Sequence, residues 1–149
     1  MLNTEALTLV QADETTLFRL NRFYKRNGHR GKASKDHLAY WLEADQTIIA
    51  GLRLEPMPWG NLLRGLWVAK QYRGLGAGQK LLNALRTQLS DAPCYCLPYV
   101  EQEAFYQRNG FQDAHDTAPA DLIKQWRSYL KRGEQLALMH YKTDQPPCD

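Results

Sequence analysis

An apolar segment that runs into three alternating glycines, and from them into a leucine-rich segment, constrains the fold of this chain more than any other feature. The apolar segment spans residues 61–69, and the glycines are Gly74, Gly76 and Gly78. The leucines that follow have helical spacing and are Leu81, Leu82, Leu85 and Leu89. The pattern predicts a buried strand, a tight turn and an amphipathic helix in succession. Because glycine has no Cβ and adopts positive φ, the backbone N–H groups of such a turn can surround a pyrophosphate at the positive end of the helix dipole.

The spacing of the glycines excludes two common phosphate-binding motifs. The dinucleotide-binding fingerprint requires G-x-G-x-x-G, whereas Gly74, Gly76 and Gly78 are spaced G-x-G-x-G. The P-loop requires G-x-x-x-x-G-K-[ST], and the sequence contains no such string. A glycine-rich turn with only a structural role is the remaining alternative.

The rest of the chain alternates between strand-like and helical segments. Strands are expected at residues 7–10, 38–43, 48–54, 61–69, 93–98 and 135–141, and helices at 13–27, after the glycines, at 101–109 and at 119–132. Asp13 is expected to cap the first helix, and Asn27-Gly28 to end it. Asp45-Gln46 is expected to form a hairpin turn, and Pro56 with Pro58 to stop the third strand. This order is typical of an α/β fold in which helices pack on one mixed α+β sheet.

Composition indicates one globular domain over residues 1–149, with a frayed tail from about residue 143. Hydrophobic residues make up 44% and charged residues 23% of the chain, as in globular proteins. No apolar run approaches the ~20 residues that span a bilayer, and residues 1–5 do not resemble a signal peptide, so no membrane partner is expected. The three cysteines fit a reducing compartment, which predicts a cytoplasmic protein.

Positive charge is concentrated near the N-terminus. Between Thr15 and Lys35 the sequence has no acidic residue and seven basic ones, which are Arg19, Arg22, Lys25, Arg26, Arg30, Lys32 and Lys35. The rest of the chain has 12 basic and 16 acidic residues, a net charge of −4. Such a local field favours an anionic ligand; a solvated helix face is the alternative. A basic nucleic-acid-binding module is a less favoured alternative, since few exposed rings for base stacking are expected beyond Phe23 and Tyr24.

No metal site is predicted. Cys94-x-Cys96 lacks the second ligand pair of a zinc site and is interpreted as two buried thiols on a strand. The four histidines do not have ligand spacing; they are His29, His37, His115 and His140.

Two motifs resemble those of the GCN5-related N-acetyltransferase (GNAT) superfamily. Arg73-x-x-Gly76-x-Gly78 resembles its acetyl-CoA-binding motif Q/R-x-x-G-x-G/A, and Gln71-x-x-Gly74-x-Gly76 fits in a second register. Residues 105–111 (FYQRNGF) resemble the family's F/L-Y-x-x-x-G-F. The order of elements over residues 7–141 is also similar. The resemblance implies a GNAT-like acyltransferase fold, with a central, mostly antiparallel sheet flanked by helices.

The resemblance implies an acetyl-CoA-dependent N-acetyltransferase that acts on a primary amine by direct transfer in a ternary complex. Acetyl-CoA would be the co-substrate, with its pantetheine arm on the backbone of Leu66 and Val68. Its pyrophosphate would lie on the turn formed by Arg73, Gly74, Gly76, Ala77 and Gly78. Tyr106 matches the tyrosine that protonates the departing thiolate, chemistry that a phenol within hydrogen-bond reach can perform. A core aromatic is the alternative for Tyr106.

Several features are left open by the sequence. Residues 98–101 lack the asparagine with which many relatives contact the cofactor. Glu55 is the first candidate for a general base, followed by Glu43 and Glu101. The acceptor is a small-molecule or peptide amine of unspecified kind; acyl chain length and homodimer formation also stay open. The stretch from Lys25 to Lys35 would favour an acidic acceptor or the CoA phosphates, and the helix at 119–132 would shape the acceptor pocket or an oligomer contact. A catalytically inactive acyl-CoA-binding sensor is the alternative function.

Overall fold

A computed structural model describes residues 6–142 of the chain. The elements are β1 (Thr8–Gln11), α1 (Leu17–Arg26), β2 (Leu38–Ala44), β3 (Thr47–Met57), β4 (Gly60–Val68), the 3-10 helix η2 (Lys70–Tyr72), α2 (Ala77–Ala84), α3 (Arg86–Ser90), β5 (Cys94–Cys96), the 3-10 helix η3 (Val100–Gln102), α4 (Glu103–Arg108), β6 (Phe111–Asp113), α5 (Ala120–Lys131) and β7 (Met139–Tyr141).

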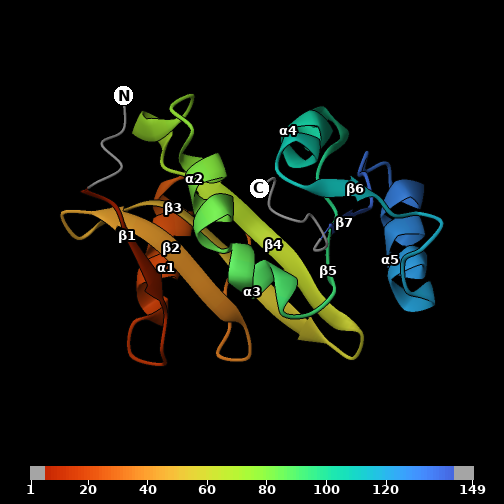
Figure 1. Cartoon of the computed structure of the whole chain (residues 1–149), viewed down its shortest axis with the longest axis horizontal. Helices are drawn as coiled ribbons and strands as arrows, with labels where there is room; N and C mark the ends of the chain where they lie inside the picture. The colour runs from red at the N-terminus through yellow and green to blue at the C-terminus, as the bar shows by residue number, and fades with distance from the viewer. Residues whose placement is uncertain (1–5, 143–149) are drawn as a thin grey trace, which may run out of the picture. The chain divides into compact units, whose positions relative to one another are not determined.

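The strands form a seven-stranded sheet in the order β1-β2-β3-β4-β5-β7-β6 (Figure 1). The pairs β1–β2, β2–β3, β5–β7 and β6–β7 are antiparallel. The predicted mostly antiparallel sheet with helices is therefore confirmed. Backbone contacts divide the chain into two compact units, Met1–Pro56 with Leu63–Leu85 and Met57–Leu62 with Arg86–Asp149. A single domain over 1–149 stays a prediction, and the predicted frayed tail from residue 143 lies outside the described residues.

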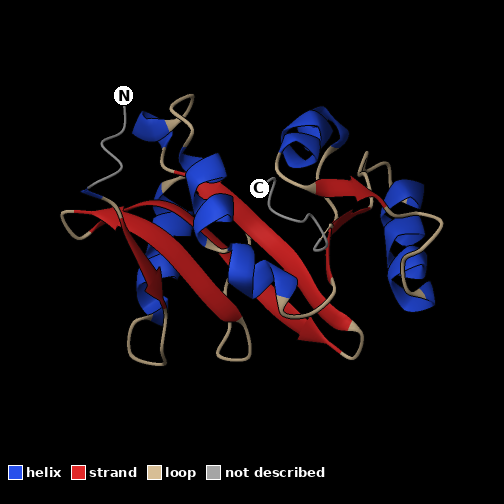
Figure 2. Ribbon diagram, in the orientation of Figure 1, coloured by secondary structure: helices blue, strands red, loops and turns tan. Residues whose placement is uncertain are grey.

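The core of the first unit lies between α1 and the strands. Leu20, Phe23 and Tyr24 form the apolar side of α1 and pack with Trp41 of β2 and Ile48 of β3. In Figures 1 and 2, α1 lies behind the strands β1–β4 and α2 lies in front of them. Each large apolar side chain buried in this way stabilises the fold by about 1.5–3 kcal/mol.

Two predicted turns, one after α1 and one between β2 and β3, are formed by short polar segments. Asn27 ends α1, and Gly28 follows with φ +86°, as predicted. Asp45 and Gln46 join β2 to β3 with φ values of +49° and +65°, which confirms the predicted hairpin turn. The prediction for Asp13 was wrong in register. Its Oδ1 accepts the amide N–H groups of residues 15 and 16, at 2.8 and 3.0 Å, but α1 begins only at Leu17, so this carboxylate fixes the turn before the helix.

Three strand predictions need correction. β3 continues through Pro56 to Met57; its pairing with β2 ends at Leu54, so the missing N–H of Pro56 breaks no bond to β2. β6 was not predicted, because its three residues are too few to show a strand periodicity. β7 begins at Met139 and not at residue 135, since residues 135–137 bond instead to the segment before α4, for example Ala137 N–H to the Pro98 carbonyl at 2.8 Å.

The helices after β4 also differ in detail from the prediction. The leucine-rich helix is divided at Leu85 into α2 and α3, although its four leucines are all buried. The helix expected at 101–109 begins as η3 and continues as α4. In α5, Leu122 is buried against Leu62 and Leu138, whereas Leu130 is 38% exposed.

Candidate functional site

The turn between β4 and α2 has an unusual backbone. Gly74 and Gly76 both have φ +81°, and Gly76 caps the first turn of α2. A Cβ added to either glycine would meet no other heavy atom of the protein within 4 Å. The backbone conformation, and not crowding by the protein, therefore requires glycine here, and the space beside the turn is available to a ligand.

The start of α2 supplies hydrogen-bond donors at this turn. The intrahelical bonding begins with the Lys80 N–H, which donates to the Gly76 carbonyl at 3.0 Å. No side chain of the described residues caps the helix. The N–H groups of Ala77, Gly78 and Gln79 precede the first intrahelical bond and lie at the positive end of the helix dipole. Such an arrangement suits an anion.

The side chain of Arg73 turns away from the glycines toward the end of β4. Its Nε donates to the Val68 carbonyl at 3.2 Å, and its guanidinium carbon lies 5.5 Å from the centroid of the Trp67 ring. The backbone of Arg73 belongs to the turn, whereas its side chain contacts the end of β4, the strand before the turn.

Asn27, at the end of α1, fixes the same region and was missed by sequence reasoning. Its carbonyl accepts the indole N–H of Trp67 at 2.7 Å, and its Oδ1 accepts the backbone N–H of Lys70 at 3.0 Å. The dipeptide Asn27-Gly28 signals only a helix end, so no sequence pattern indicated this second role.

The predicted cofactor-binding residues form one continuous segment of the first unit. Leu66 and Val68 are partly buried in β4, and the turn residues 73–78 follow directly. Tyr106 lies in the second unit, on α4, and is 6% exposed. Its ring packs edge-on against Phe105 and Phe111, with centroids 5.2 and 5.4 Å away.

The three candidate bases differ in their surroundings. Glu55 pairs with Arg64 at 3.3 Å, and both side chains are about one-third exposed. Glu43 pairs with Arg19 at 3.0 Å and also accepts the indole N–H of Trp41 at 2.9 Å, so it is engaged in the structure of the sheet. Glu101 is exposed on η3.

A second polar cluster in the first unit was not predicted. Arg53 of β3 is 6% exposed, and its NH1 lies 3.2 Å from Nε2 of His29. Its guanidinium carbon lies 5.3 Å from the ring centroid of Tyr24. Burial, followed by the charges of Arg53 and Arg64, lowers the pKa of His29 to about 4, and burial raises the pKa of Tyr24 to about 12. The only signal in the sequence is one arginine within an apolar strand.

Comparison with protein families identifies the chain. Residues 35–113, more than half of its length, match the family described as "Acetyltransferase (GNAT) domain". The chain belongs to the GNAT acetyltransferase family. A search of curated proteins with this sequence gives no match.

Solved structures of GNAT proteins share the fold of this GNAT chain at low sequence identity. N-acetylglutamate synthase from Neisseria gonorrhoeae, complexed with coenzyme A and L-arginine, has a TM-score of 0.69 and 19% identity over 93% of this chain and 34% of its own. This chain therefore spans about a third of that protein. The ribosomal-protein-S18-alanine N-acetyltransferase from Escherichia coli has a TM-score of 0.65 and 16% identity, covering 96% of this chain and 97% of its own. A chimera of the Vibrio cholerae spermidine N-acetyltransferase has a TM-score of 0.62 and 13% identity, covering 94% and 97%.

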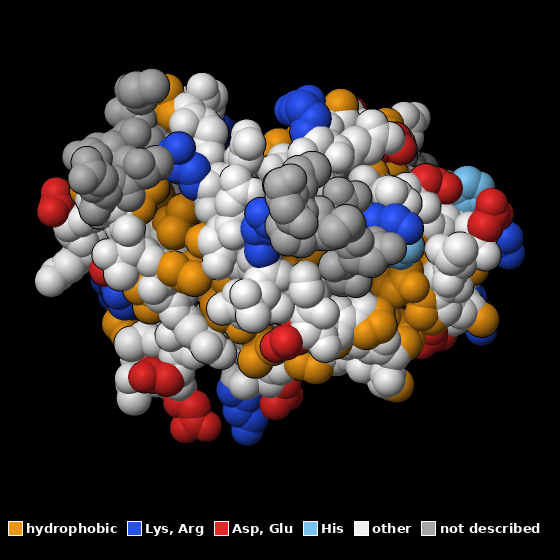
Figure 3. All heavy atoms as spheres, viewed as in Figure 1, with side chains coloured by type: hydrophobic (Ala, Val, Ile, Leu, Met, Phe, Trp, Pro, Cys, Tyr) orange, Lys and Arg blue, Asp and Glu red, His pale blue; other side chains and the backbone are white. Residues whose placement is uncertain are grey.

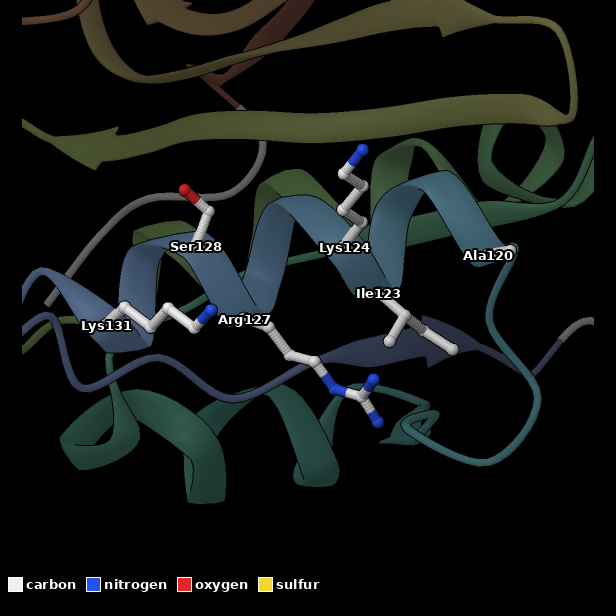
Figure 4. Close-up of a pocket in the computed structure, with 6 residues that line it drawn as sticks. All are labelled: Ala120, Ile123, Lys124, Arg127, Ser128 and Lys131. Atoms are coloured by element: carbon white, nitrogen blue, oxygen red, sulfur yellow. The ribbon is translucent and has the colours of Figure 1, made fainter.

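Further depressions of the described surface include one of about 340 Å³, lined in part by Arg19, Arg22 and Arg26 of α1, and another on α5. The depression on α5, of about 520 Å³, is lined by one helix alone, with Lys124, Arg127 and Lys131 splayed around Ile123 (Figure 4). Within residues 6–142, no three His, Cys, Asp or Glu side chains are grouped so that they could hold a metal ion. None of the described helices combines the length and apolar character needed to cross a membrane.

Proposed function

We propose that this GNAT chain is an acetyl-CoA-dependent N-acetyltransferase that transfers the acetyl group directly to a primary amine in a ternary complex. The observation that carries the proposal is the turn from Arg73 to Gly78. It combines two left-handed glycines, open space beside them and the uncapped first turn of α2. These donors fit the pyrophosphate of coenzyme A, which is what the corresponding family motif binds.

Each predicted residue then has a defined task. The N–H groups of residues 73–78 hold the pyrophosphate, and the backbone of Leu66 and Val68 binds the pantetheine arm. The N–H of Val68 also polarises the carbonyl group that is attacked. Asn27 and the side chain of Arg73 hold β4, η2 and the turn in register.

The reaction needs one proton removed and one supplied. Acetyl-CoA supplies a thioester, whose carbonyl carbon forms the new bond to the amine nitrogen while the bond to sulfur breaks. Glu55 takes the proton that the amine must lose, directly or through water. Tyr106 gives a proton to the departing sulfur, whose ordinary pKa of about 8.5 lies below the value of about 10 for a phenol.

Structural relatives support an amine acceptor. By name, the Escherichia coli enzyme acts on an alanine of a ribosomal protein and the Vibrio cholerae enzyme on spermidine. Both are N-acetyltransferases. The buried thiols Cys94 and Cys96 also fit the reducing cytoplasm in which we place the enzyme.

Calorimetry with acetyl-CoA and a thiol-release assay with a panel of amines test the proposal together. We expect saturable binding of acetyl-CoA and turnover with at least one amine. A mass-spectrometric screen of a metabolite extract then identifies the acetylated product. Binding without turnover across the panel would instead indicate an acyl-CoA sensor, and no binding at all would overturn the proposal.

A further inference from the structure

Arg53 carries a charge inside an apolar strand. Nearly all of its neighbours in β3 from Ile48 to Leu54 are apolar, and all of them are buried. Among residues 6–142, no carboxylate forms an ion pair with Arg53, and its buried Nε has no hydrogen-bond partner. A cation that is removed from water without a counter-charge is unfavourable for folding unless an anion pairs with it.

Two glycines make room for this guanidinium. A Cβ on Gly31 would lie 2.6 Å from NH2 of Arg53, and a Cβ on Gly65 would collide with NH1. Gly65 has φ +64° inside β4, the sign of a bulge, and its carbonyl accepts the hydroxyl of Tyr24 at 2.8 Å. Backbone from two separate segments therefore approaches the cation and brings no side chain that could neutralise it.

The groups described around Arg53 do not balance the charge of its guanidinium. His29 is neutral near pH 7, since burial and the nearby arginines lower its pKa to about 4, and burial keeps Tyr24 protonated by raising its pKa to about 12. Arg64 is balanced by Glu55. His29 and Gly65, which lie beside the guanidinium, are both partly exposed.

We propose that Arg53 binds the carboxylate of the acceptor, so that the acceptor is a small amine that also carries a carboxylate, with an α-amino acid as the simplest case. The proposal rests on the proposed function. A guanidinium presents forked donors that match a carboxylate. Glu55 lies two residues further along the same face of β3, with its Cα about 7 Å from that of Arg53, so the strand places the proposed general base near the cation. The basic residues from Arg19 to Lys35 favour the approach of an anionic molecule.

The first experiment compares matched acceptors. The wild-type protein is given acetyl-CoA with an equimolar mixture of the twenty amino acids and their carboxamides, and the products are counted by mass spectrometry. We expect at least one free acid to be acetylated about 10- to 100-fold faster than its amide, since a lost charged hydrogen bond has about this effect. Equal rates for acids and amides, or a preference for polyamines, would overturn the proposal.

The second experiment changes the cation. In Arg53→Met, we expect the KM for the carboxylate acceptor to rise about 10- to 100-fold and its advantage over the amide to disappear, while the affinity for acetyl-CoA is unchanged. Arg53→Lys keeps the charge but lacks the forked donors, so its KM for the carboxylate acceptor should lie between those of wild type and Arg53→Met. Arg86→Met, which removes an exposed arginine of α3, serves as the control and should behave as wild type. An equal rise in KM for acids and for amides in Arg53→Met would overturn the proposal.

Thermal unfolding separates binding from a purely structural role. Because the charge is uncompensated, Arg53→Met should unfold at the same temperature as wild type or higher. The twenty amino acids, tested singly, should include at least one that protects wild type and not Arg53→Met. A variant that unfolds much earlier and a wild type that no amino acid protects would together overturn the carboxylate site. This readout needs no turnover, so failure of acetyl-CoA binding would reject only the proposed function.

Discussion

His29 contacts a permanent cation, and this contact fixes its protonation state. A guanidinium can only donate hydrogen bonds, so Nε2 of His29, 3.2 Å from NH1 of Arg53, must accept. The ring proton therefore lies on Nδ1. Protonation of Nε2 would place two cations in contact within a largely buried cluster, which explains the direction of the pKa shift.

The lowered pKa of His29 predicts a loss of stability in acid. Its pKa is about 4 when folded and 6.5 in an unfolded chain, so the unfolded state binds more protons between these values. The contribution of neutral His29 to the free energy of unfolding is complete above pH 6.5 and is lost as the pH falls toward 4. After allowance for solvent screening, we expect this one histidine to account for about 1–2 kcal/mol. Urea unfolding at pH 7.5 and pH 5 measures the loss, which should shrink in His29→Gln and persist in His115→Gln.

Tyr106 is expected to act on the leaving group and not on cofactor binding. Tyr106→Phe keeps the ring that packs on Phe105 and Phe111 but removes the hydroxyl. We expect kcat to fall by about tenfold to 100-fold, with an unchanged Kd for acetyl-CoA, because a positioned acid contributes at least this much. Tyr99→Phe, at a tyrosine that is 51% exposed, is the control. An unchanged kcat would remove Tyr106 from the mechanism.

At the scale of elements, the turn between β4 and α2 can be tested against a turn of equal geometry. Gly76 (φ +81°) and Gly133 (φ +91°) both lie at helix ends with no protein atom near a Cβ. Valine at either position introduces backbone strain of about 1–3 kcal/mol. Gly76→Val alone should abolish acetyl-CoA binding in calorimetry, because its side chain occupies the space beside the turn. If both variants bind acetyl-CoA with wild-type affinity, the turn is not the pyrophosphate site.

Elements that depend on local pattern could be predicted from the sequence, and elements that depend on distant partners could not. The turn at Asp45-Gln46 and the glycine turn are each encoded within a few residues. β6 and the shortened β7 exist through pairing with each other, which no local pattern reveals. The site divides in the same way. The proposed cofactor-binding residues lie within 66–78, whereas Arg53, His29 and Gly65 meet only after folding.

At the scale of the whole molecule, positive charge is concentrated on α1 and the loop that follows it. Phe23 and Tyr24 of the basic stretch are 6% and 1% exposed, whereas Phe18 is 54% exposed and its ring centroid lies 5.3 Å from the guanidinium carbon of Arg22. Arg19 is engaged with Glu43. Figure 3 shows the face opposite α1, on which acidic and basic side chains are interspersed. The positive field of this segment favours the approach of an anionic molecule, and we expect a small anion.

Acetyl-CoA binding should stabilise the whole chain. At a concentration 100 times its Kd, a ligand that binds only the folded state adds about 2.7 kcal/mol, which raises the Tm of a chain of this size by about 5–10 °C. Calorimetric unfolding with and without acetyl-CoA measures the shift. Gly133→Val should retain the shift and Gly76→Val should lose it. An equal shift in Gly76→Val would contradict the assigned binding site.

The burial of Cys94 and Cys96 in β5 has a practical consequence. Their exposed fractions are 1% and 2%, and burial raises the pKa of Cys96 well above its usual range. Chromogenic disulfides react with thiolates, so they consume liberated coenzyme A long before they reach these side chains. With Cys148, outside the described residues, replaced by serine, the proposed release of coenzyme A can be followed continuously by absorbance with a low blank from the folded protein.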